Sequence, residues 1–105
     1  DEERGALILG GSIEQGAKLR ILSCGQKDIL SGARTATGLA LAGLSQPDAA
    51  LLFNCMSRKV AMGSRYRDEV AEALCVLPAG LPVAGFYTFG ELSPVAGTTL
   101  HHEST

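Results

Sequence analysis

Two apolar runs with a helical pattern between them are the feature that most constrains the fold. Residues 49–55 read Ala-Ala-Leu-Leu-Phe-Asn-Cys, a continuous run typical of a strand buried on both faces of a sheet. Residues 83–89 carry three aromatic side chains and predict a second buried strand, which ends at a turn made by Gly90 and Glu91. Residues 64–77 place apolar side chains at helical spacing. Together they predict a βαβ unit with parallel strands and a right-handed crossover.

The remaining segments predict two more strands and a second helix. Residues 6–9 and 17–22 are expected to be strands, joined as a hairpin-like pair through a glycine-rich segment. Residues 27–44 carry a broad apolar stripe at helical spacing, and Asp28 can cap that helix. The predicted order is β-β-α-β-α-β, a mixed sheet with two helices in the α/β class. An α+β arrangement is the alternative, and a short last strand near residue 100 can follow.

Composition narrows the class of protein. The chain has 105 residues, which predicts a single domain, and its formal net charge is −2. It lacks the clustered Lys and Arg of a nucleic-acid-binding surface, and no apolar run approaches the ~20 residues of a membrane span. The three cysteines are odd in number and lack CxxC spacing, which favours reduced thiols in the cytoplasm. The charged N-terminal residues carry no signal peptide.

Topology predicts where a site would lie. The carboxyl ends of parallel strands meet at one edge of a sheet, where ligands of open α/β sheets bind. The loop expected over residues 56–63 leaves the first strand there, and Gly90 and Glu91 leave the second. Arg58 and Glu91 are therefore expected to be neighbours. They either form a salt bridge or flank a pocket for a zwitterionic or polar small molecule. In the second case, Arg58→Ala is expected to weaken ligand binding with little loss of stability.

The predicted ligand-binding residues gather at this edge, and none is predicted to be catalytic or to bind a metal. They are Cys55, Ser57, Arg58, Tyr87, Gly90, Glu91 and His101. On a strand, His101 and His102 would point to opposite faces and could not easily share one metal. Either one could still serve as an axial haem ligand. Cys55 is a candidate nucleophile if a histidine lies near it, although a buried inert cysteine is the common alternative.

Several phrases resemble the C-terminal part of the FIST family, sensory domains named for F-box and intracellular signal transduction proteins. They are Phe-Asn-Cys-Met-Ser-Arg at 53–58, Glu69, Gly-Phe-Tyr-Thr-Phe-Gly-Glu at 85–91, Leu-His-His-Glu-Ser-Thr at 100–105, and the turn and basic strand over 11–22. Two departures are His102, where the family more often has Asn, and Ser104, where Thr is usual. The family has an N-terminal half and a longer final strand, so the chain is expected to be part of a longer protein.

The resemblance implies a bacterial sensory input module without catalysis. Such domains are proposed to bind small ligands, with amino acids or similar polar molecules as candidates. The implied partners are the N-terminal half of the same domain and a downstream signalling module, such as a histidine kinase, a methyl-accepting domain or a cyclic-dinucleotide enzyme. No cofactor is expected. Two alternatives remain open: a haem-binding nitric-oxide sensor that uses His101 or His102, and a thiol enzyme that uses Cys55.

Overall fold

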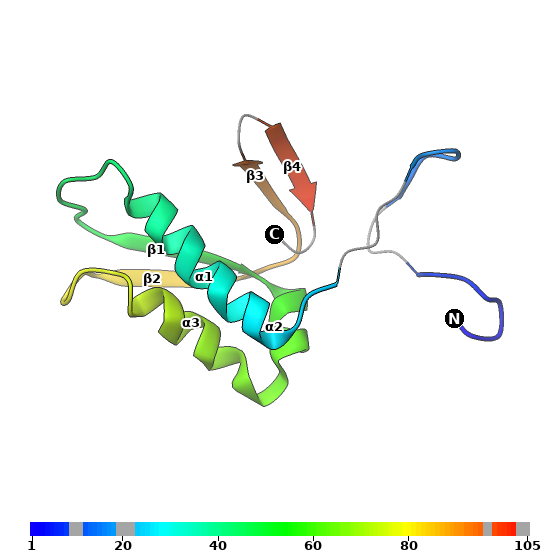
Figure 1. Ribbon diagram of the computed structural model, residues 1–105, viewed down its shortest axis with the longest axis horizontal. Coiled ribbons are helices and arrows are strands. Elements are labelled where there is room, and N and C mark those ends of the chain that lie inside the picture. Colours follow the sequence, from blue (N-terminus) through cyan, green and yellow to red (C-terminus); the bar gives the residue numbers. More distant parts are fainter. Residues whose placement is uncertain (9–11, 19–22, 96–97, 103–105) are drawn as a thin grey trace.

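A computed structural model of the chain describes residues 1–8, 12–18, 23–95 and 98–102. Its centre is a two-stranded parallel sheet with helices beside it (Figure 1). Strand β1 (Ala50–Cys55) pairs with β2 (Val83–Thr88) over their whole lengths. This pairing confirms the mixed α/β class and the predicted parallel strands of the βαβ unit. The handedness of the crossover stays a prediction.

Helix α1 (Gln26–Leu41) has a capping box at its N-terminus. The N-cap is Gly25, and Asp28, at the third helical position, accepts a hydrogen bond from the Gly25 N–H at 2.7 Å. Asp28 therefore caps the helix as predicted, but from the third helical position, where its carboxylate satisfies a backbone donor and complements the helix dipole. The helix ends three residues before the predicted boundary at 44, where Gly43 takes a left-handed φ of 85°.

The segment between the two parallel strands is more helical than predicted. Helix α2 (Met56–Met62) follows β1 directly, so the expected loop over residues 56–63 is wrong. A single 3-10 turn, η1 (Gly63–Arg65), leads into α3 (Tyr66–Leu74), which confirms the predicted helix of the βαβ unit. Gly63, the C-cap of α2 and first residue of η1, joins these two elements with a left-handed φ of 56°, a conformation that favours glycine.

The sheet is covered on one face. Leu52 and Asn54 of β1 face a cavity walled by α1 and α3, and both side chains are half-buried. On the other face, Leu51 and Phe53 are 67% and 53% exposed. Phe53 packs edge-to-face against Phe86 of β2, with ring centroids 5.1 Å apart. The prediction of strands buried on both faces is wrong, because α1 and α3 lie on the same side of the described sheet (Figure 1).

A second small sheet follows β2. Gly90 takes a φ of 106°, and strand β3 (Glu91–Val95) pairs with β4 (Thr98–His102) in antiparallel fashion. The expected loop after Glu91 is thus largely a β-hairpin, and the predicted last strand is present. Pro94 lies within β3, which an edge strand tolerates because one side of it makes no ladder hydrogen bonds.

The N-terminal residues 1–8 and 12–18 carry no strand and extend away from the helices and sheet (Figure 1). The two strands predicted at 6–9 and 17–22 fall partly on residues 9 and 19–22, which lie outside the described residues. Among the described helices, none is long and apolar enough to cross a membrane.

Candidate functional site

A buried ion pair holds the helices together where β1 ends. Arg58, in the first turn of α2, places its Nε 2.5 Å from Oε1 of Glu69 in α3. A second guanidinium nitrogen, Nη2, donates to the Ile29 carbonyl oxygen of α1 at 3.1 Å. One side chain therefore connects α1, α2 and α3. Only 2% of the Glu69 side chain is exposed, against 23% for Arg58.

Glu69 has one carboxylate oxygen satisfied and one not. Its Oε2 is buried and has no hydrogen-bond partner among the described residues. A buried acceptor without a donor costs free energy, and the cost is larger for a charged group. An additional hydrogen-bond donor at this atom would therefore be favourable.

Aromatic rings form a second cluster next to this pair. The Tyr87 hydroxyl donates to the Tyr66 carbonyl oxygen at 3.4 Å, and the two rings lie 6.3 Å apart. Lys59 places Nζ 4.9 Å from the centroid of each ring, a distance suited to cation–π attraction. The cluster holds α2, the start of α3 and the end of β2 together.

The two tyrosines of the chain lie in opposite electrostatic surroundings. Burial raises the pKa of Tyr87, and the charge of Glu69 adds to this rise. The Arg67 guanidinium donates to the Tyr66 hydroxyl at 3.0 Å and lowers the pKa of that phenol. The folded state therefore favours the neutral, protonated form of Tyr87. Its contribution to stability is present below the ordinary tyrosine pKa of about 10 and is lost as pH rises through its raised pKa.

We expect the tyrosine absorbance of the folded protein to titrate in two separate steps. Tyr66 ionises first and Tyr87 second, because their pKa values are shifted in opposite directions. A spectrophotometric pH titration measures this directly, and Tyr87→Phe is expected to remove only the upper step. A single shared step in the wild-type protein would contradict the assignment.

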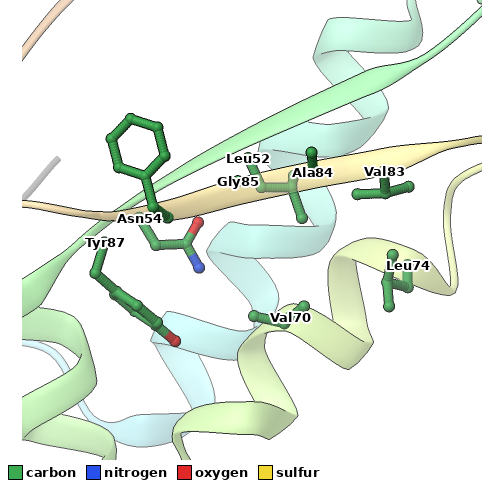
Figure 2. A pocket seen from close by; sticks show the side chains of 9 residues that line it. Leu52, Asn54, Val70, Leu74, Val83, Ala84, Gly85 and Tyr87 are labelled. Atoms are coloured by element: carbon green, nitrogen blue, oxygen red, sulfur yellow. The ribbon is translucent and has the colours of Figure 1, made fainter.

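A larger and a smaller cavity lie among the described residues on the helix-covered face of the sheet. The larger, of about 300 Å³, lies between β2 and α3; Figure 2 shows Val70 and Leu74 of α3 below the strands, with Leu74 on the side of Val83. The smaller, of about 150 Å³, lies between α1, α3 and β1 and is lined by Arg58 and Glu69, among others. Leu52 and Asn54 line both cavities and therefore form the wall that they share.

Arg58 and Glu91, which the sequence predicted to be neighbours, interact with different residues in the structure. Arg58 forms its ion pair with Glu69, and Glu91 accepts a hydrogen bond from the Thr88 hydroxyl. Because Cys55 and Thr88 are partners in the sheet register, the two strand ends do meet at one edge, as predicted. Arg58 lines the smaller cavity and Tyr87 the larger one.

The other predicted site residues line neither cavity. Cys55 is fully buried at the end of β1, Ser57 is exposed on α2, and Gly90 forms the turn before β3. His101 pairs with Leu92 in the β3–β4 register. Their proposed roles in ligand binding stay predictions.

From the sequence, Glu69 was named only among the phrases that resemble the FIST family, and Asn54 was given no role. A signal for Glu69 was present in its spacing, because it follows Tyr66 by three positions and precedes Ala73 by four. It therefore lies on the apolar face of α3, where a carboxylate requires a buried partner. Asn54 is the polar residue in an otherwise apolar strand, and this pattern could have identified it as a site residue.

The fold and site define a small α/β domain with cavities between its sheet and helices. The FIST C domain family matches residues 1–94, and the chain belongs to this family. The match confirms the family suggested by the sequence phrases and places the chain among the sensory domains of signal transduction.

Two relatives align with the whole length of this chain. Two uncharacterized proteins, one from each of two strains of Mycobacterium tuberculosis, are each 34% identical to it over 110 residues. The alignment covers 100% of this chain and 27% of each relative, so the chain spans about a quarter of their length. No solved structure matches the chain.

Proposed function

We propose that this chain is a small-ligand-binding sensory input domain of a bacterial signal-transduction protein in the cytoplasm. It is non-catalytic, needs no cofactor, and takes an amino acid or a similar small polar molecule. The observation that carries the proposal is the larger cavity, of about 300 Å³. This volume lies at the lower end of the ~300–1,000 Å³ range of small-molecule sites.

The lining of this cavity suits a ligand with an apolar body and a polar end. Leu52, Val70, Leu74 and Val83 supply apolar walls that favour a hydrocarbon side chain. Asn54 offers both a donor and an acceptor, and Tyr87 offers a hydroxyl. An amino acid with an aliphatic side chain combines these two properties.

The position of the cavity supports a sensory role. Its walls come from α3 and from both parallel strands, so a bound ligand would bridge elements far apart in the chain. A ligand that favours one packing of α3 against the sheet would shift the population of that packing. The rest of the protein and a downstream signalling module would then read the change.

The proposal is tested by calorimetric titration of the intact protein with apolar L-amino acids, including leucine, valine and methionine. Val70→Phe places a larger side chain at the cavity wall and is expected to weaken binding by about tenfold or more, because it takes space from the ligand. Val60→Phe is the matched control, since Val60 lies on α2, is 75% exposed and lines neither cavity.

Two results would contradict the proposal. One is that no amino acid in the series binds the wild-type protein. The other is that Val70→Phe binds as tightly as Val60→Phe while both variants melt at the wild-type temperature. The melting temperatures separate loss of the cavity from loss of the fold.

A further inference from the structure

Glu69 lines the smaller cavity and has one carboxylate oxygen without a hydrogen-bond partner among the described residues, while Arg58 binds the other oxygen. Glu69 and Arg58 both line this cavity of about 150 Å³. Oε1 of the carboxylate is bonded to Arg58 Nε, whereas Oε2 has no hydrogen-bond partner among the described residues. The cavity therefore presents a buried acceptor beside a cationic group.

The guanidinium also retains donor capacity. Its Nε–H donates to Glu69 and one N–H of Nη2 donates to the Ile29 carbonyl, whereas a guanidinium carries five N–H donors in all. Since 23% of the Arg58 side chain is exposed, the guanidinium is not sealed inside the protein. The pair thus combines an unpartnered acceptor, Oε2 of Glu69, with a guanidinium that has more donors than these two bonds use.

Charge balance selects the head group that fits such a pair. The ion pair is neutral, so an ammonium ion alone would leave one uncompensated positive charge in a largely buried site. A carboxylate alone would leave one negative charge. Uncompensated buried charges are costly. A group that carries both an ammonium and a carboxylate keeps the site neutral, donates to Glu69 Oε2 and accepts from Arg58.

We infer that Glu69 and Arg58 recognise the α-ammonium and α-carboxylate groups of an amino acid through the smaller cavity. This inference rests on the proposed function, because it names the chemistry of the head group that the domain selects. Asn54 and Leu52 line both cavities, so a head group at Glu69 and an aliphatic side chain in the larger cavity would meet at this shared wall. Glu69 is thus the carboxylate that flanks the ligand together with Arg58, a role that the sequence suggested for Glu91.

The test compares an amino acid with the same molecule lacking its amino group, using calorimetry on the intact protein. The apolar L-amino acid that binds most tightly is used; for leucine, the analogue is isocaproic acid. Glu69→Gln keeps the size of the side chain and the acceptor that faces Arg58, but it removes the charge that attracts an ammonium group. We expect the variant to bind the amino acid about tenfold more weakly or worse, with little change for the analogue.

Glu72→Gln is the matched control. Glu72 lies one turn further along α3 and pairs with Arg34 of α1 through Arg34 Nη1 and Glu72 Oε2 at 2.7 Å, on the surface. This variant is expected to bind both molecules as the wild-type protein does. Circular dichroism checks that Glu69→Gln is folded. If it is not, Glu69→Asp, which keeps the charge and shortens the side chain, is tested for the same discrimination between the two molecules.

The outcomes separate this inference from the proposed function. If the amino acid binds and Val70→Phe weakens it, but the Glu69 variant loses affinity equally for both molecules or for neither, the inference is overturned and the proposed function stands. If no amino acid binds the wild-type protein, the proposed function itself fails. Selective loss of amino acid binding in the Glu69 variant supports both.

Discussion

Gly85→Ala is expected to unfold the α/β unit at temperatures where the wild-type protein is folded. A Cβ atom at Gly85 would lie 2.0 Å from the Leu52 carbonyl oxygen and 2.9 Å from the Leu52 carbonyl carbon. These are backbone atoms of the neighbouring strand, in register with Gly85, so relief requires the two strands to separate. We expect a loss of about 3 kcal/mol or more, seen as a drop of roughly 12 °C or more in melting temperature.

Gly38→Ala provides the matched control. Gly38 lies inside α1, and a Cβ atom there would meet nothing within 4 Å outside its own helix backbone. The same substitution should therefore stabilise the protein by about 0.5–1 kcal/mol, since alanine favours a helix interior more than glycine does. Thermal unfolding followed by circular dichroism measures both variants. If Gly85→Ala melted within about 3 °C of Gly38→Ala, the close pairing of β1 and β2 would be wrong.

The pairing itself was predictable because local patterns determine it. Two apolar runs separated by a helical pattern leave few alternatives to a parallel pair, and the meeting of Cys55 with Thr88 follows from that topology. The close approach of Gly85 to Leu52 could not be predicted. It depends on the register between the strands, and the sequence allows several registers.

Burial of the strands was predicted incorrectly for a related reason. A continuous apolar run such as residues 50–55 shows that both faces of a strand avoid water, but not what covers each face. In the described structure α1 and α3 both cover the face of Leu52 and Asn54, which leaves Phe53 and Phe86 exposed on the other. Coverage of a face depends on the path of the whole chain, which local patterns do not contain.

The candidate site was predictable in position but not in its pairing. Arg58 was identified from its place after β1, where parallel strands end. Its partner was expected at Glu91, the other charged residue at that edge, although the spacing of Glu69 from Tyr66 and Ala73 places Glu69 on the apolar face of α3. The tertiary packing of α3 against α1 and β1 decides this, and it makes Glu69 the buried partner.

The second large effect is expected from Arg58→Met, which should destabilise the protein by about 3–5 kcal/mol. The substitution keeps an apolar stem but leaves the Glu69 carboxylate, 2% exposed, without its cation. Removing one partner of a buried ion pair is costly because the remaining charge stays desolvated. The sequence alone predicted little loss of stability for Arg58→Ala, and the burial of Glu69 reverses that expectation. Urea denaturation followed by circular dichroism measures the difference.

Two companion variants identify the cause. Arg34→Met removes the cation of the surface pair with Glu72, whose side chains are 56% and 31% exposed, and should change the stability little, because water screens exposed ion pairs. The double variant Arg58→Met/Glu69→Leu replaces both buried charges with apolar groups and should recover most of the stability lost by Arg58→Met, because no unpaired charge remains. If the double variant were no more stable than Arg58→Met, the loss would come from the hydrogen bond to Ile29 and from packing, and Glu69 would not be the reason that the chain keeps a cation at position 58.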